Sequence, residues 1–430
     1  MLRKTLYAFL FTLLIVSCSK QSAEPQPEFV RVENGEFMIG DSVYRYVGTN
    51  FWYGAILGSQ GRGGNRERLD KELDLLQQTG INNLRVLVGG DGEEDVPSHI
   101  MPVLQTAPGV YNDTILDGLD YLVAELEKRD MKAVLYLNNA WEWSGGYGTY
   151  LEWATNERTP NPGIDGYQNY MHHVAKFVTN DSAKQLAANH TKNIVTRTNR
   201  YTGKPYSESP AIMSWQIANE PRAFASDSLT KSEFSKWIAS QAALIKSLDK
   251  NHLVSTGSEG ENGCEGDIEL WNQIHSDPNI DYGILHLWPY NWGWIDETTM
   301  VDSVGVAKDY TYKYIKPHSD RMKAIGKPLV LEEFGYPRDG FQFQPGSPTK
   351  GRDEFYSYVF DLIAESDMIN GCNFWGWGGY AEPAHERWEK WDDYTGDPAQ
   401  EQQGLNSVFA KDKSTLEIIK RAAKRIGNEN

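Results

Sequence analysis

The segment Pro328-Leu329-Val330-Leu331-Glu332-Glu333-Phe334, with the helical pattern that follows it at residues 353–365, decides the fold. The segment has the short apolar composition of a β-strand, and the apolar spacing after it is typical of an amphipathic helix. A strand followed by a helix is the repeating unit of proteins with a parallel sheet. Recurrence of this unit along the chain therefore predicts an α/β fold.

The same unit occurs eight times between residues 44 and 426. Strands are expected at residues 44–50, 81–88, 132–137, 211–218, 253–256, 282–288, 328–334 and 372–377, and helices at 66–79, 114–129, 165–178, 231–248, 268–274, 306–325, 353–365 and 416–426. Eight units predict a single closed (β/α)8 barrel of the TIM type, with long loops on the C-terminal face of the strands. A doubly wound open sheet is the alternative, but no glycine-rich phosphate-binding turn follows the first strand, which ends Gly48-Thr49-Asn50-Phe51.

The composition is that of a globular protein rich in aromatic residues. The 430 residues include 42 basic and 59 acidic side chains, and the net charge of −17 disfavours binding to nucleic acid. The 14 Trp and 23 Tyr residues suit a protein that stacks side chains against rings. No second domain boundary is visible, so residues 29–430 are expected to form one domain.

The N-terminal residues have the pattern of an export signal. Two basic residues precede an apolar run at residues 6–16, and the Cys18 that follows resembles the lipid-attachment site of bacterial lipoproteins. We expect a signal peptide at residues 1–17, lipid on Cys18 and a tether at residues 18–28, with a plain secretory signal as the alternative. The protein is then expected in the cell envelope, on its periplasmic or outer face, and held at the membrane only by the lipid. The remaining cysteines could form a disulfide or stay as buried thiols: Cys264 and Cys372.

The carboxyl ends of the predicted strands carry many polar and aromatic side chains. In a barrel of this type the reacting groups lie at these ends and in the loops after them. Ten of the 14 tryptophans lie there: Trp52, Trp141, Trp143, Trp288, Trp292, Trp294, Trp375, Trp377, Trp388 and Trp391. The polar side chains there include Asn50, Arg85, Asn139, Asn219, Glu220, His286 and Glu333. Aromatic platforms beside such groups are typical of carbohydrate sites.

Glu220 and Glu333 end the fourth and seventh strands and should face each other across the barrel mouth. Two carboxylates can hydrolyse a glycosidic bond when one attacks the anomeric carbon and the other protonates the leaving oxygen. A retaining reaction needs them about 5 Å apart, which facing strands can provide. Glu332 is expected to point to the opposite side of its strand from Glu333 and to be structural.

Several segments resemble glycoside hydrolase family 5. Trp215-Gln216-Ile217-Ala218-Asn219-Glu220-Pro221 resembles its acid/base motif, and Leu329-Val330-Leu331-Glu332-Glu333-Phe334-Gly335 resembles its nucleophile motif. Four further segments are similar to the mannan-degrading subfamily, which contains β-mannanases and exo-β-mannosidases: residues 47–52, 83–86, 138–146 and 286–292. The resemblance extends from about Phe29 to the last helix.

The resemblance implies roles for individual residues. Glu333 would be the nucleophile, Glu220 the acid/base, and Asn219 the partner of the sugar 2-hydroxyl. Arg85 would lower the pKa of the nucleophile, His286 would contact the sugar or the acid/base, and Trp375 would lie under the reacting ring. One position departs from the family, because Trp288 stands where most members have a tyrosine whose hydroxyl steadies the nucleophile. An indole can donate one hydrogen bond but cannot accept one, so either Trp288 takes the place of the tyrosine or Tyr290 reaches the nucleophile. The other expected substrate contacts are Trp52, Trp141, Trp288 and Trp292.

The leading hypothesis is retaining hydrolysis of β-1,4-mannosidic linkages in mannan or manno-oligosaccharides by an endo-β-1,4-mannanase. An exo-β-mannosidase is the first alternative, in which the long loops at residues 141–163 and 380–405 would close one end of the cleft. A β-1,4-glucan hydrolase and a non-catalytic glycan-binding lipoprotein are the others. The reaction needs only carboxylates and water, so no cofactor and no metal is expected.

Overall fold

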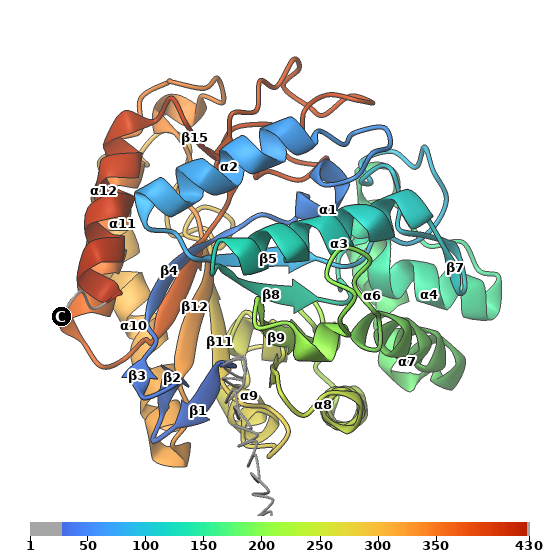
Figure 1. Cartoon of the computed structure of the whole chain (residues 1–430). Helices are drawn as coiled ribbons and strands as arrows, with labels where there is room; N and C mark the ends of the chain where they lie inside the picture. Colours follow the sequence, from blue (N-terminus) through green and yellow to red (C-terminus); the bar gives the residue numbers. More distant parts are fainter. Residues whose placement is uncertain (1–27, 428–430) are drawn as a thin grey trace, which may run out of the picture.

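The computed structural model describes residues 28–427 and shows a barrel of eight parallel strands surrounded by helices (Figure 1). Between β10 (Leu253–Ser255) and β11 (Gly283–Leu287) the barrel is closed by separate backbone hydrogen bonds, from Asp281 N to Val254 O (2.9 Å) and from His286 N to Glu259 O (3.4 Å). The predicted barrel and its eight predicted strands are confirmed: β4 (Tyr46–Asn50), β5 (Asn83–Leu87), β8 (Lys132–Tyr136), β9 (Ile212–Gln216), β10 (Leu253–Ser255), β11 (Gly283–Leu287), β12 (Leu329–Phe334) and β13 (Gly371–Phe374).

Seven of the predicted helices are confirmed: α2 (Arg66–Thr79), α3 (Asp113–Lys128), α8 (Ser228–Leu248), α9 (Ile268–His275), α10 (Val304–Ile325), α11 (Lys350–Glu365) and α12 (Lys413–Ile426). The helix predicted at residues 165–178 is wrong. Helix α6 (Tyr167–Val174) is shorter, and the long outer helix is α7 (Asp181–Val195). Asn180 starts α7, because its side chain accepts a hydrogen bond from Ala183 N. Few large apolar residues mark α7, so its periodicity is weak.

A small antiparallel sheet covers the end of the barrel where the strands begin. It consists of β1 (Arg31–Glu33), β2 (Glu36–Ile39) and β3 (Ser42–Val43), and it lies opposite the end toward which the β5 and β8 arrows point (Figure 1). Phe37 of β2 is buried against Tyr46 and Tyr282, and these rings belong to the core cluster inside the barrel. A second, larger core lies between the strands and the helices. The covered end leaves the carboxyl ends of the strands as the open face.

The loops at this open face contain short elements of their own. After β4 comes α1 (Gly54–Leu57), and after β5 comes the hairpin β6 (Gln105–Ala107) and β7 (Val110–Tyr111). The loop after β8 contains α4 (Gly146–Thr155) and α5 (Pro162–Asp165). The long loop after the last barrel strand starts from β14 (Trp377–Gly379) and returns at β15 (Val408–Phe409), and these two strands pair in parallel.

Buried polar groups hold the 380–405 loop in place. The carboxylate of Asp397 accepts hydrogen bonds from the backbone N–H groups of Gly404 (2.9 Å) and Ser407 (3.1 Å). The fully buried Arg352 of α11 donates to Leu405 O (2.6 Å) and Ser407 O (2.9 Å). Because these bonds end on backbone carbonyls and amides, they fix the path of the loop and not only its side chains.

Two further predictions concern the cysteines and the membrane. Cys264 and Cys372 are both free thiols and both buried. The predicted signal peptide at residues 1–17 and the lipid site Cys18 lie outside the described residues. Within residues 28–427, no helix has the length and apolar character needed to cross a membrane.

Candidate active site

Glu220 follows β9 in a strained backbone conformation. The pairing of β8 with β9 continues beyond the strands through a bridge between Asn139 and Asn219, and Glu220 comes next with a φ of 47°. Its N–H donates to Gly257 O (3.0 Å). A side chain at Gly257 would place its Cβ only 1.8 Å from Ala218 O, so only glycine fits there. The left-handed conformation costs Glu220 about 1–3 kcal/mol, as is common where a fold aims a functional side chain.

Glu333 and Glu332 face the same side of β12, so the expectation that Glu332 points away is wrong. The register between β11 and β12 pairs Leu285 with Leu331 but His286 with Glu333, which leaves Glu332 as an extra residue. This bulge breaks the alternation of side chains along the strand. Both carboxylates consequently meet the same arginine, because Arg85 lies 3.3 Å from Glu332 and 2.5 Å from Glu333.

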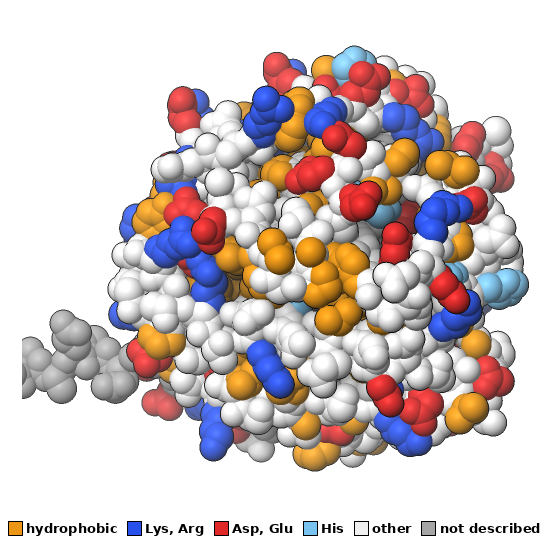
Figure 2. All heavy atoms as spheres, turned by 90° about the vertical axis from the view of Figure 1, so that its right-hand side faces the viewer, with side chains coloured by type: hydrophobic (Ala, Val, Ile, Leu, Met, Phe, Trp, Pro, Cys, Tyr) orange, Lys and Arg blue, Asp and Glu red, His pale blue; other side chains and the backbone are white. Residues whose placement is uncertain are grey.

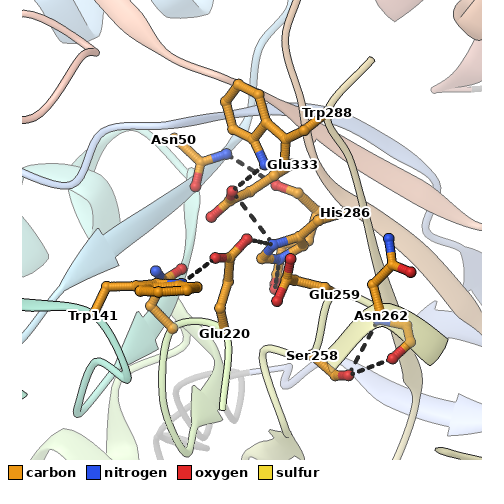
Figure 3. Close-up of polar contacts among 12 residues, drawn as sticks. Asn50, Trp141, Glu220, Ser258, Glu259, Asn262, His286, Trp288 and Glu333 are labelled. Carbon is orange, nitrogen blue, oxygen red and sulfur yellow. Dashed lines mark hydrogen bonds and ion pairs between the residues drawn. The ribbon is translucent and has the colours of Figure 1, made fainter. Parts of the chain in front are cut away.

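His286 of β11 lies between the two candidate catalytic carboxylates (Figure 3). Its Nδ1 is 2.8 Å from Glu220 Oε1 and 3.3 Å from Glu333 Oε2. The facing oxygen and nitrogen atoms of Glu220, His286 and Glu333, one from each side chain, all lie within 4.8 Å of one another. Retaining glycosidases hold their carboxyl groups about 5 Å apart, whereas inverting enzymes need about 6.5–9.5 Å to admit a water. The observed spacing fits a retaining reaction.

Arg85 orients the acceptors around it from a fully buried position in β5. Its Nη1 donates to Glu333 Oε1 and to Asn50 Oδ1 (3.0 Å), and its Nη2 donates to Asn219 Oδ1 (2.8 Å). Its Nε donates to Gln216 Oε1 (2.8 Å). Because Asn219 Oδ1 is occupied by Arg85, the amide of Asn219 is held in one orientation beside Glu220.

Two indoles donate to the carboxylates (Figure 3). Trp141 Nε1 donates to Glu220 Oε2 (2.5 Å), and Trp288 Nε1 donates to Glu333 Oε2 (3.1 Å). Trp288 thus supplies a donor where most of the family would supply a tyrosine hydroxyl. Tyr290 does not reach the nucleophile position, because its hydroxyl donates to Glu297 (3.0 Å).

Burial and charge set the ionisation of the cluster. Burial raises the pKa of Glu333 to about 7, although His286 and Arg85 both act to lower it. Burial acts in the same direction on Glu220, but the contacts with His286, Arg222 and Trp141 together outweigh it and lower the pKa of Glu220. Burial would lower the pKa of His286, but Glu333 and Glu220 outweigh that effect and raise it to about 9. Around neutral pH, Glu220 and His286 therefore share one proton across their hydrogen bond.

A cavity of about 290 Å³ lies over these carboxylates, and Asn219, Glu220 and Glu333 form part of its wall. Hydrophobic side chains gather near the centre of the face toward which the strands point (Figure 2). Arg85 and His286 are fully buried and do not line the cavity, so they act through the carboxylates. Five of the ten tryptophans singled out in the sequence line it: Trp141, Trp143, Trp288, Trp292 and Trp375.

The prediction that Trp52 contacts the substrate is wrong. The ring is 1% exposed and packs against Trp143 and Tyr394, and its Nε1 donates to Gly396 O (2.9 Å). It supports the 380–405 loop from below and is not part of the cavity wall.

The cavity is also lined by charged residues beyond those predicted from the sequence. Arg222 donates through Nε to Glu259 Oε2, and both line the cavity beside Glu220. Arg222 directly follows the Asn219-Glu220-Pro221 motif, which was an available signal. Glu259 lies beyond the short fifth strand, where no motif stands out. On the other side, the cavity is lined by Glu142, Tyr167, Pro398, Gln400 and Glu401.

The catalytic cluster is also the place where a metal would be considered. Among residues 28–427, Glu220, His286 and Glu333 are the group of acidic or histidine side chains close enough to share an ion. Their atoms are engaged with one another and with Trp141 and Trp288. The Arg85 cation beside Glu333 opposes a second cation. We therefore assign the cluster to proton transfer and nucleophilic attack.

Paired carboxylates at the ends of the fourth and seventh barrel strands, under aromatic walls, define the class of glycoside hydrolases. The chain belongs to glycoside hydrolase family 5. The sequence model described as GH family 5 beta-mannosidase-like matches residues 27–429.

Individual relatives agree with this membership. Mannan endo-1,4-beta-mannosidase 1 of Arabidopsis thaliana is 28% identical over 382 residues, which is 84% of each chain. The glycoside hydrolase family 5 mannosidase of Rhizomucor miehei superposes with a TM-score of 0.85 at 32% identity, over 94% of this chain and 98% of that one. The endo-beta-1,4-mannanase of Thermotoga petrophila gives a TM-score of 0.67 at 26% identity, over 90% and 78% of the two chains.

Proposed function

We propose that the protein hydrolyses β-1,4-mannosidic linkages with retention of configuration, and that it acts at the ends of manno-oligosaccharide chains. The observation that carries the reaction is the proximity of Glu220 and Glu333, which have oxygens within 4.8 Å of each other. The choice of mannosyl substrates is supported by the relatives, whose names describe mannan endo-1,4-beta-mannosidases and mannosidases.

The reaction takes two steps. Glu333 attacks the anomeric carbon while Glu220 protonates the leaving oxygen, which gives a glycosyl ester on Glu333. Glu220 then takes a proton from water, and this water displaces Glu333 from the sugar. Arg85 and Trp288 stabilise the Glu333 carboxylate, which favours its departure in the second step. Asn219 lines the cavity next to Glu220 and is placed to bind the 2-hydroxyl.

Action at chain ends is supported by the 380–405 loop. Its residues Pro398, Gln400 and Glu401 form one wall of the cavity. The bonds that Asp397 accepts and Arg352 donates keep this wall in place, which supports a cleft closed at one end. The volume of about 290 Å³ is at the low end of small-molecule sites, which run from ~300 to 1,000 Å³. The sequence favours endo action, but this wall supports the exo alternative.

The same wall offers acceptors for the hydroxyls of a terminal sugar. Glu401 Oε2, Gln400 Oε1 and Glu142 Oε2 are shielded from solvent and have no hydrogen-bond partner. An unpaired buried acceptor costs about 1–3 kcal/mol, which a sugar hydroxyl would recover. Burial raises the pKa of Glu142 to about 7 and that of Glu401 to about 8, so both can also donate near neutral pH. A terminal mannose with several free hydroxyls fits such a wall better than a linked one.

A time course with mannohexaose and with mannohexaose blocked at its non-reducing end tests this function. The account expects mannose or mannobiose as the first products of the free hexasaccharide and no cleavage of the blocked one. Early mixed oligosaccharides, or cleavage of the blocked substrate, would establish endo action instead. No product from either would overturn the mannosyl assignment, and cello-oligosaccharides would then separate a β-glucan hydrolase from a glycan-binding protein.

We propose in addition that the protein is exported and carries lipid on Cys18. The support is the apolar run at residues 6–16 and the cysteine that follows it. The full chain expressed in a Gram-negative host should partition into detergent and incorporate labelled palmitate. A Cys18→Ser variant should lose the label and enter the aqueous phase; equal labelling of both forms would refute the proposal.

A further inference from the structure

Glu332 is a fully buried carboxylate close to the catalytic pair, and the two-step reaction does not use it. Its Oε2 accepts a hydrogen bond from Gln216 Nε2 (2.6 Å) and lies 3.3 Å from Arg85 Nε. The same oxygen is 4.0 Å from His286 Nε2. Neither Glu332 Oε1 nor His286 Nε2 has a hydrogen-bond partner. An isolated buried charge is costly, so this carboxylate requires a cation nearby.

The charges around Glu332 do not balance without a proton. Arg85 is a single cation that faces two carboxylates, Glu332 and Glu333. The next group that can carry positive charge is His286. When protonated, its Nδ1–H points at Glu220 and its Nε2–H at Glu332, because both ring nitrogens of a charged histidine are donors.

We propose that Glu332 is a positioning residue that keeps a proton on the His286–Glu220 pair, so that Glu220 can give a proton to the leaving oxygen. In the first step the shared proton passes from His286 Nδ1 to Glu220 along the 2.8 Å contact and from Glu220 to the glycosidic oxygen, which leaves Glu220 as a carboxylate and His286 neutral. In the second step Glu220 takes a proton from water and returns it to His286. Against the effect of burial, the pKa of His286 is raised to about 9 by Glu333 and by its contacts with Glu220 and Glu332.

Glu333 also faces His286 Nδ1 at 3.3 Å and is paired with Arg85, and the other charged groups near the pair are matched or uncharged at neutral pH. Glu259 is paired with Arg222, which removes it as the partner of His286. Burial raises the pKa of the tyrosines next to Glu332 well above its ordinary value, so they remain neutral. The titratable and charged groups facing Glu332 and His286 are Tyr46 of β4, Arg85 of β5, Tyr136 of β8, Tyr282 before β11, Glu333 of β12, Glu220 and Arg222 after β9, and Glu259 after β10.

The test is the pH dependence of kcat/KM, which reports on groups of the free enzyme. Glu332→Gln keeps the shape of the side chain but removes its charge, so the shared proton is held less tightly. The alkaline limb should move to lower pH by ~1 unit or more, as expected for the loss of a charge at 4–6 Å. Asp249→Asn is the matched control, because it removes the carboxylate 2.6 Å from His252, a buried histidine outside the site. The alkaline limb of the Asp249→Asn profile should stay at the wild-type pH.

An alkaline limb of Glu332→Gln that coincides with that of the wild type would overturn the proposal. If Glu332→Gln does not fold, the ¹⁵N spectrum of His286 in the wild-type protein decides. Both ring nitrogens should be protonated at neutral pH, and a neutral imidazole there would refute the role of Glu332. The inference rests on the proposed hydrolysis, but the two fail differently: an inactive wild type contradicts the hydrolysis, whereas an unshifted variant of an active enzyme contradicts only the role of Glu332.

Discussion

Trp288 Nε1 donates a hydrogen bond of 3.1 Å to Oε2 of Glu333, so an indole steadies the candidate nucleophile. Arg85 donates to the other oxygen of the same carboxylate. Both oxygens of Glu333 therefore have a fixed donor, which leaves one orientation for attack. Trp288 also lines the cavity and packs edge to face with Trp375. This packing holds the indole N–H in its position beside Glu333.

Trp288→Phe should keep an aromatic side chain in the cavity wall but remove the N–H that donates to Glu333. A hydrogen bond to a charged group contributes about 1.5–3 kcal/mol, so kcat should fall by roughly 10–100-fold. The pKa of Glu333 should also rise, and the acidic limb of the pH profile should move upward. Trp294→Phe is the control, because Trp294 stacks on Tyr310 and does not line the cavity. Equal effects of the two substitutions would contradict the role of the indole.

Glu220→Ala should discriminate between substrates by their leaving groups. A general acid contributes about 10²–10⁴-fold when the leaving oxygen needs a proton. Manno-oligosaccharide hydrolysis should fall by that factor, whereas release of dinitrophenol from its β-mannoside should stay fast in the first turnover. Stopped-flow kinetics would show this as a burst. A loss of the same size for both substrates would speak against Glu220 as the acid.

The wild-type enzyme should have a bell-shaped pH profile on the alkaline side of neutrality. Glu333 must be ionised to attack, so kcat/KM should fall as the pH drops below its pKa of about 7. The pair of Glu220 and His286 must hold its proton, so kcat/KM should fall as the pH rises above about 9. Initial rates across this range test both limbs. Full activity in mildly acidic buffer with no loss would show that Glu333 ionises at lower pH than the structure indicates.

Glu401→Ala should weaken recognition of the terminal sugar. If Glu401 bonds to a sugar hydroxyl, its loss should lower kcat/KM on mannobiose by roughly 2–10-fold, the value of a hydrogen bond to an uncharged group, because Glu401 carries a proton near neutral pH. Glu389→Ala is the control, because Glu389 is exposed in the same loop and does not line the cavity. If both variants keep the wild-type rate on mannobiose, the wall does not bind the substrate.

The sequence was sufficient to predict the site residues that lie at the ends of the barrel strands. Glu220 and Glu333 follow short apolar strands, and the eightfold alternation already places those ends on one face. Asn219 and Trp288 belong to the same ends, and both line the cavity. These residues are found by pattern because the barrel topology converts a position along a strand into a position in space.

Other parts of the site depend on contacts that no local pattern reveals. The direction in which the Glu332 side chain points follows from a register shift between β11 and β12. Such a shift depends on two strands that are separate in the sequence. Trp52 is buried by Tyr394, a residue of a loop far away in the sequence. Glu401 reaches the cavity only because buried groups such as Arg352 fix the 380–405 loop.

Trapping the glycosyl-enzyme tests the central claim most directly. The full chain would be incubated with 2-deoxy-2-fluoro-β-mannosyl fluoride, which forms the ester quickly and releases it slowly, and the digest would be analysed by mass spectrometry. The account predicts one fluoromannosyl group on the peptide that contains Leu329 to Phe334, attached to Glu333. Attachment to Glu332 or Glu220, or turnover without any adduct, would contradict it.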